Sequence, residues 1–241
     1  MTIGRDDRII ILGSCFETGI GLRLRNAGFD VCINPFGTIF NPRSIANSVS
    51  RLVTSEPFTS GDCVPMGAGA GKICSFWHHT SFARPTEEEF LANANASLAE
   101  ASRIWKECNK VIINFDTAQV WRHDGKTVSN CLKRPGYEFT HEMLTLDEII
   151  ECIRTIRVPG KDFLFTISPF RHLGEGAHVN TISKSLLHLG LQLEGCDYFP
   201  SYEIVIDELR DYSYFDADRV HPSEEAMDIV FKRFCEACVR I

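Results

Sequence analysis

Short apolar runs alternate along this chain with longer amphipathic runs, and this alternation restricts its fold more than any other feature. The apolar runs are typical of buried strands and occupy residues 8–12, 29–33, 111–115 and 163–167, with a short fifth run within 198–206. Helical patterns separate or follow them at residues 16–26, 42–54, 86–108, 145–156, 180–193 and 223–241. This order predicts an α/β fold in which a mostly parallel five-stranded sheet carries helices on both faces.

Two segments show neither the apolar runs of strands nor the amphipathic pattern of helices. Residues 59–84 are rich in glycine, and residues 116–142 contain Asp124-Gly125, a pair that favours a hairpin turn. No linker-like or low-complexity stretch divides the chain. We therefore expect a single domain over residues 1–241, with irregular insertions near 59–84 and 116–142.

The charge of the chain disfavours some classes of partner. Its 241 residues carry a net charge of -7, and no run of Lys or Arg stands out. Such a chain is not expected to bind nucleic acid or an anionic membrane surface. The apolar run at residues 9–12 is far too short for a signal segment or a membrane span. We expect a cytoplasmic protein that acts on small molecules, and its oligomeric state stays open.

The ten cysteines are scattered through apolar segments. In a chain without a signal segment, most are expected to be reduced and buried. Cys235 and Cys238 form the one pair with metal or redox spacing, but they lie in a helical segment and no second pair accompanies them. The sequence therefore predicts neither a metal site nor a cofactor.

The loops that follow the predicted strands carry the parts of a Ser-His-Asp hydrolase. Ser14 follows the first strand, and Asp218 and His221 stand three residues apart near the other end of the chain. Such residues need only meet in space. One short loop can set the carboxylate against imidazole Nδ1 and leave Nε2 aimed at the serine. Because ligands bind at the carboxyl ends of parallel strands, we expect these loops to form the active site.

Each of these assignments has a competitor. Ser14 is also suited to cap the first helix through its hydroxyl. Cys15 is the rival nucleophile, since a thiol at a helix N-terminus can be activated. Asp216 competes with Asp218 for the imidazole, although only Asp218 has the three-residue spacing.

Other polar and aromatic residues are candidates for substrate binding. Trp77 and His78 are expected to line the pocket, with plain packing in the interior as the alternative for the histidine. Adjacent histidines at 78 and 79 point to opposite sides and would chelate a metal poorly. Arg171 and His172 follow the fourth strand, at the ligand-binding edge. Arg171 suits an anionic or hydroxyl-rich substrate, and pairing with a nearby carboxylate is the alternative.

Several motifs together resemble those of one known family. Gly13-Ser14-Cys15-Phe16 is similar to the signature of the GSCFA family, a branch of the SGNH/GDSL-like hydrolases, with Glu17 in place of the final alanine. The resemblance continues in order along the chain through Asn34-Pro35-Phe36-Gly37, Asn41-Pro42, Trp77-His78-His79, Asn130-Cys131, Ser168-Pro169, Arg171-His172, Ser183-Lys184 and His221-Pro222-Ser223.

This resemblance implies a flavodoxin-like three-layer α/β/α fold with Ser14 as nucleophile, His221 as base and Asp218 as its orienting acid. It also implies that the backbone N–H groups of Ser14 and Gly37 stabilise the oxyanion, and Asn34, on the same loop as Gly37, is expected to belong to the oxyanion or substrate-binding site.

The third oxyanion donor departs from the family pattern. This chain has Asp116-Thr117 where the family tends to have Gly-Thr. A carboxylate there would oppose an oxyanion unless it turns away or is paired, which leaves Thr117 as the substitute donor.

The function that follows is hydrolysis of an ester through an acyl-enzyme on Ser14. The preferred substrate is an O-acyl group on a carbohydrate or another hydroxylated small molecule. An O-acyltransferase with the same triad and a non-catalytic binding module with the same fold are the alternatives. The identity of the acyl group and of the alcohol stays open.

Overall fold

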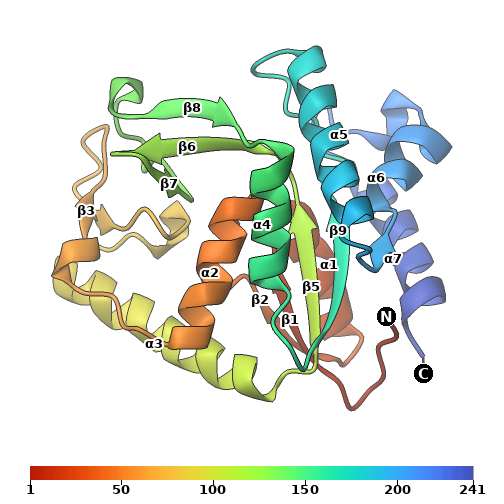
Figure 1. Ribbon diagram of the computed structural model, residues 1–241, viewed down its shortest axis with the longest axis horizontal. Helices are drawn as coiled ribbons and strands as arrows, with labels where there is room; N and C mark the ends of the chain where they lie inside the picture. Colours follow the sequence, from red (N-terminus) through yellow and green to blue (C-terminus); the bar gives the residue numbers. More distant parts are fainter. Residues whose placement is uncertain (241) are drawn as a thin grey trace.

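A five-stranded sheet in which every pair of neighbours is parallel forms the centre of the computed structural model, which describes residues 1–240 (Figure 1). Its strand order is β10-β9-β5-β1-β2, with β1 at Arg8–Leu12, β2 at Asp30–Ile33, β5 at Lys110–Phe115, β9 at Asp162–Ile167 and β10 at Tyr198–Phe199. The predicted sheet is confirmed. Counted along the chain, the order is that of flavodoxin-like folds.

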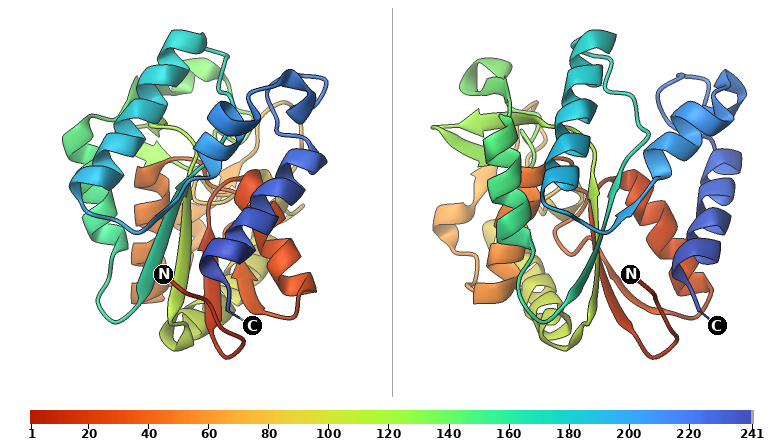
Figure 2. Two further views of the ribbon diagram at one scale, coloured as in Figure 1. Left: turned by 90° about the vertical axis from the view of Figure 1, so that its right-hand side faces the viewer. Right: turned by 45° about the vertical axis from the view of Figure 1, so that its right-hand side comes forward.

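Helices cover both faces of this sheet and make three layers (Figure 2). One face carries α1 (Cys15–Asn26) and α7 (Glu224–Cys238). The other carries α2 (Pro42–Thr54), α3 (Glu87–Glu107), α4 (Leu146–Ile156) and α5 (Ala177–Leu193).

Alternation along the strands explains why both faces are apolar. Ile9 and Ile11 of β1 pack on the side of α1 and α7, and Ile10 and Leu12 pack on the opposite side. All four are at most 1% exposed. The strand therefore has to be apolar throughout, as its sequence predicted.

The insertion predicted near 116–142 is not irregular throughout. It forms a second sheet of three antiparallel strands, β6 (Gln119–His123), β7 (Lys126–Val128) and β8 (Thr140–Met143), in the order β7-β6-β8. The hairpin was predicted, but β8 was not, because its pairing with β6 depends on residues distant in sequence. In Figure 1 this sheet lies across the top, at the side where the central strands end.

The remaining elements are short. The insertion near 59–84 holds a two-stranded sheet of β3 (Val64–Pro65) and β4 (Ile73–Cys74). After β10 the chain turns into α6 (Ser201–Glu203) and a further helical turn at Ile204–Leu209. Within residues 1–240, no helix combines the length and the apolar character needed to cross a membrane.

Candidate active site

The turn between β1 and α1 lies against the end of β5, where the strand order reverses. Gly13 approaches Asn114 so closely that a Cβ on the glycine would lie 2.5 Å from the Asn114 Cβ. Asn34 ties the same turn down, because its Oδ1 accepts from the Gly13 N–H at 2.8 Å and its Nδ2 donates to Thr18 at 2.9 Å. The β1–α1 turn is thus held rigidly at the position where α/β folds bind ligands.

Ser14 occupies this turn with its side chain directed inward. Its hydroxyl donates to Asn114 Oδ1 at 2.7 Å, and the residue has no solvent exposure. It does not cap α1 through its hydroxyl. Among the described residues, no hydrogen bond joins Ser14 to His221. The predicted proton transfer from Ser14 to His221 is therefore not set up by a direct hydrogen bond.

Cys15 is the first residue of α1 and, unlike Ser14, it is exposed. Partial desolvation and then the charge of Asp116 raise the pKa of its thiol, whereas the N–H groups of Phe16 and Cys15 act in the opposite direction. The thiol at rest is therefore neutral, and it needs a base to become a nucleophile.

His221 and Asp218 form a close pair on the loop before α7. Nδ1 of His221 lies 2.6 Å from Oδ2 of Asp218, and each side chain is about half-exposed. The other carboxylate oxygen accepts from the N–H groups of Val220 and His221 at 2.8 and 3.0 Å. The ring of His221 first, and then these N–H groups, lower the pKa of Asp218 to about 2. Asp216, its competitor, meets His221 only through its own backbone N–H.

Phe170 and Arg171 connect this loop to the end of β9. The Phe170 ring contacts the rings of His221 and His172 at centroid distances of 4.5 and 4.6 Å. Arg171 donates from its backbone to Val220 at 3.2 Å and from its guanidinium to the Arg219 carbonyl at 2.9 Å. Arg171 therefore braces the His221 loop, with its guanidinium committed to a carbonyl there.

Asp116 is buried and paired with cationic groups. A paired carboxylate is one of the two arrangements in which it would not oppose a nearby oxyanion. Its carboxylate is 1% exposed and lies 3.3 Å from Lys184 Nζ and 3.0 Å from His172 Nε2. Lys184 also donates to the Asp116 carbonyl and, at 2.7 Å, to the Ser168 carbonyl. Burial would raise the pKa of Asp116, but Lys184 and His172 outweigh it and hold that pKa below its usual range.

The other predicted oxyanion donors are engaged in internal bonds. The Gly37 N–H donates to the Asn34 carbonyl at 2.7 Å, and the Thr117 N–H donates to Phe40 at 3.1 Å. The Thr117 hydroxyl bonds Ser183 and accepts from Gln119. The N–H groups directed at the Cys15 sulfur are instead those of the first turn of α1.

His78 does not line a pocket, contrary to prediction. It has no exposure, and its ring lies among Phe36, Phe58, Phe82 and Phe90 at centroid distances of 4.6 to 5.6 Å. Burial first, and then Arg51, lower the pKa of His78 to about 3, so it is a neutral part of an aromatic cluster. Trp77 does line a cavity, but this cavity contains none of Ser14, Cys15 and His221.

Sequence reasoning gave no role to two residues of this site, Asn114 and Lys184, although Lys184 belongs to one of the motifs that resemble the family. Asn114 is a polar residue inside an apolar strand, and its Nδ2 is buried without a partner. Lys184 is the one Asp, Glu, Lys or Arg among residues 180–193. A lone charge on an otherwise uncharged helical segment was the signal that could have found it, since buried charges are usually paired.

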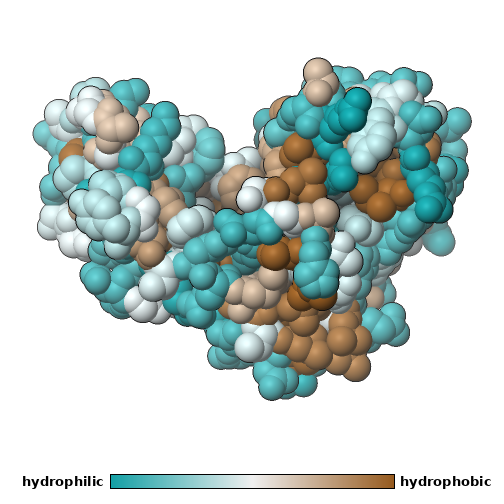
Figure 3. Space-filling view, turned by 90° about the horizontal axis from the view of Figure 1, so that it is seen from above, coloured by the Kyte–Doolittle hydropathy of each residue, from teal (hydrophilic) through white to brown (hydrophobic). Residues whose placement is uncertain are grey.

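The carboxyl edge of the sheet thus gathers Cys15, the Asp116–Lys184–His172 cluster and the Asp218–His221 pair. Figure 3 looks onto this side, where the surface is hollowed between its left and right parts. Over residues 1–240, no group of three or more His, Cys, Asp or Glu side chains is placed to hold a metal ion. The sequence model of the GSCFA family matches residues 8–234. No curated protein matches the chain.

Proposed function

This chain belongs to the GSCFA family, and we propose that it cleaves an ester by covalent catalysis at the end of β1, with Cys15 as nucleophile and His221 as base. One observation carries the choice of nucleophile. The Ser14 hydroxyl is fully buried and bonded to Asn114, whereas the next side chain, Cys15, is exposed at the first position of α1. In this arrangement the Cys15 sulfur, rather than the Ser14 hydroxyl, is open to a substrate carbonyl.

A series of contacts supports placing Cys15 and His221 in one site. The charge of Asp116 acts on the Cys15 thiol, Asp116 contacts His172, and Phe170 contacts both His172 and His221. The exposed Asp218–His221 pair, rather than the buried Asp116–His172 pair, is suited to move a proton. Nδ1 of His221 is fixed by Asp218, which leaves Nε2 free to accept.

The reaction then has two halves. Nε2 of His221 takes the thiol proton as the sulfur attacks the acyl carbonyl, and the proton passes to the departing alcohol. This leaves a thioester on Cys15. Water, deprotonated by the same nitrogen, attacks the thioester, releases the acid and returns the proton to the thiol. The N–H groups of the first turn of α1 stabilise the oxyanion of both halves.

The substrate class remains an O-acyl group on a carbohydrate or other hydroxylated small molecule, and transfer of the acyl group to an alcohol uses the same steps. The non-catalytic alternative rested on the charge of Asp116. Lys184 lies 3.3 Å from that carboxylate and compensates its charge, which favours the catalytic proposal over this alternative.

Three alanine variants test the assignment. We expect Cys15→Ala and His221→Ala to abolish hydrolysis of p-nitrophenyl acetate, and Cys63→Ala, a matched change of a partly exposed cysteine, to leave it unchanged. Peptide mapping after reaction with a chloromethyl ketone and with a fluorophosphonate identifies the modified side chain.

Ser14→Ala separates the two nucleophiles. Loss of activity in this variant with retention in Cys15→Ala, together with fluorophosphonate on Ser14, would show that serine is the nucleophile after all. Retention of activity in both Cys15→Ala and Ser14→Ala would contradict covalent catalysis at this turn.

A further inference from the structure

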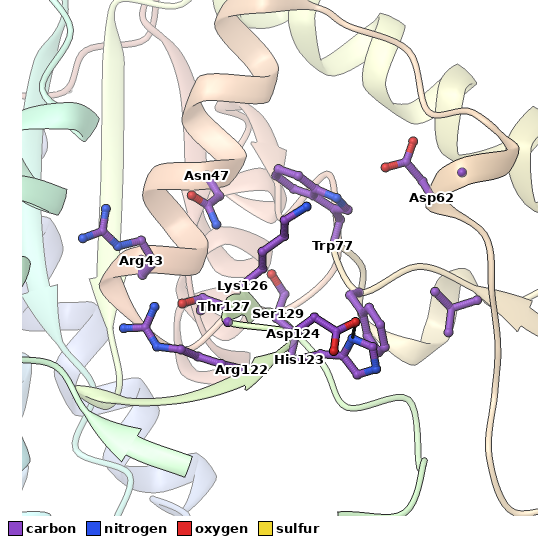
Figure 4. Close-up of a pocket in the computed structure, with 15 residues that line it drawn as sticks. Arg43, Asn47, Asp62, Trp77, Arg122, His123, Asp124, Lys126, Thr127 and Ser129 are labelled. Atoms are coloured by element: carbon purple, nitrogen blue, oxygen red, sulfur yellow. Dashed lines mark ion pairs between the residues drawn. The ribbon is translucent and has the colours of Figure 1, made fainter. Parts of the chain in front are cut away.

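The largest cavity described lies away from the active-site residues. It has a volume of about 760 Å³ and is bounded by α2, the β6–β7 hairpin and the segment that carries Trp77 (Figure 4). This volume lies within the range of small-molecule sites, which span about 300–1,000 Å³. None of Cys15, Asp218 and His221 lines it.

Most of the charged groups around this cavity are already neutralised. Arg43 pairs with Glu151 at 2.8 Å, Arg122 pairs with Glu142 and Glu148, and Asp62 pairs with Arg51 at 3.5 Å. Asp124 lies at the hairpin turn, 90% exposed and 3.3 Å from His123. These groups give the cavity little net charge of their own.

Lys126 differs from them. No Asp or Glu in the part of the chain that the structure describes comes within 4 Å of its ammonium. Figure 4 shows its side chain extending between Asn47 and Trp77 into the cavity. It therefore offers one uncompensated positive charge to a ligand.

Several polar side chains near the Lys126 ammonium have no hydrogen-bond partner among the described residues. The Thr127 hydroxyl is buried and has no hydrogen-bond partner. The side chains of Asn47 and Ser129 also line the cavity, and neither forms a side-chain hydrogen bond within residues 1–240. Trp77 adds a flat apolar surface with an N–H at its edge.

We propose that this cavity binds an acidic sugar, a carbohydrate that carries one carboxylate. The indole face takes the C–H side of the sugar ring, the polar side chains take its hydroxyls, and Lys126 takes the carboxylate. A nucleotide would also stack on Trp77, but its phosphate carries more negative charge than Lys126 compensates, and among the described residues that line the cavity no other Lys or Arg is unpaired. The inference concerns binding alone and does not depend on the proposed reaction.

Calorimetry with the wild-type protein tests this site, because none of the probes is an ester. Three probes separate its parts: cellobiouronate, which carries one carboxylate, the matched neutral disaccharide cellobiose, and AMP. We expect cellobiouronate to bind with Kd of about 1 mM or tighter, and cellobiose and AMP to bind at least about tenfold more weakly. No cellobiouronate binding, or tighter binding of AMP or cellobiose, would overturn the proposal.

Substitutions at one exposed position locate the bound sugar. Lys126→Gln should weaken cellobiouronate binding about tenfold, and Lys126→Arg should retain it because the charge is kept. Lys232→Gln on α7 is the matched control and should have no effect. Equal affinity in Lys126→Gln and wild type would place any bound sugar elsewhere and contradict the inference.

Discussion

Two carboxylate–imidazole pairs lie at the same edge of the sheet, and they differ mainly in burial. Asp218 and His221 are 2.6 Å apart and about half-exposed, whereas the Asp116 carboxylate, 3.0 Å from His172, is 1% exposed and also contacts Lys184. Water reaches the first pair, so its ring nitrogen can exchange protons with a substrate. The second pair is held by the buried charge of Lys184. Removing that charge alone would leave the carboxylate of Asp116 buried and uncompensated.

The two pairs should therefore respond differently to substitution. Breaking the buried cluster leaves an uncompensated charge in the protein interior, which costs stability. Breaking the exposed pair exchanges one solvated arrangement for another, which costs little stability but removes a base.

The largest effect is expected at Lys184. Lys184→Met leaves Asp116 buried without its cation and should lower the free energy of unfolding by about 3–5 kcal/mol. Urea unfolding measures this. Arg154→Met, which breaks the exposed pair with Glu194, is the control and should leave the free energy of unfolding almost unchanged. Adding Asp116→Leu to Lys184→Met should recover part of the loss, and a loss no greater than the control would mean that the buried cluster is not tightly coupled.

At the exposed Asp218–His221 pair we expect the opposite result, a large loss of activity with little loss of stability. His221→Ala should reduce ester hydrolysis by about 10²–10⁴-fold, because the general base is lost. The free energy of unfolding should change by about 0.5 kcal/mol or less. Steady-state kinetics and urea unfolding of the same preparation separate the two quantities. A large loss of stability would show that the pair is structural, like its buried counterpart.

A third carboxyl, that of Glu17 at the start of α1, forms no ion pair with an imidazole or a cation within residues 1–240. Glu17 is 1% exposed, its Oε2 has no partner, and burial raises its pKa to about 8. In the unfolded chain its pKa is about 4.3, so between these values the folded state holds a proton that the unfolded state has released. Its contribution to stability is full below about pH 4 and is lost as the pH rises to about 8, by on the order of 3–5 kcal/mol.

Unfolding by urea across this pH range checks the effect of Glu17. Glu17→Gln and Glu17→Ala should both flatten the decline in stability, since neither side chain titrates. Glu17→Ala also restores the residue implied by the name of the family. A decline as steep as that of wild type in both variants would refute the prediction.

The smallest effect is expected at Asp216. Because the imidazole contacts Asp218, Asp216→Asn should change hydrolysis by less than about twofold, whereas Asp218→Asn should reduce it by about tenfold or more. Initial rates at saturating ester compare them. The opposite ranking would assign the orienting role to Asp216.

Much of the fold could be predicted because its signals are local. The apolar strands and amphipathic helices follow from side-chain periodicity, and the strand-helix alternation implies the parallel sheet. The pairing of Asp218 with His221 was also predictable, because both residues lie on one short loop. β8 was missed because its pairing with β6 is set by contacts between distant segments.

The sequence by itself therefore determined the layers of the fold, the edge of the sheet where the polar loops meet and the carboxylate that contacts His221. Only the tertiary structure decided which side chains at that edge face solvent. It buried Ser14 against Asn114, placed His78 among aromatic rings and brought Lys184 to Asp116 from 68 positions away. Periodicity and spacing along the chain act over a few residues, whereas the burial of a side chain depends on which distant segments pack around it.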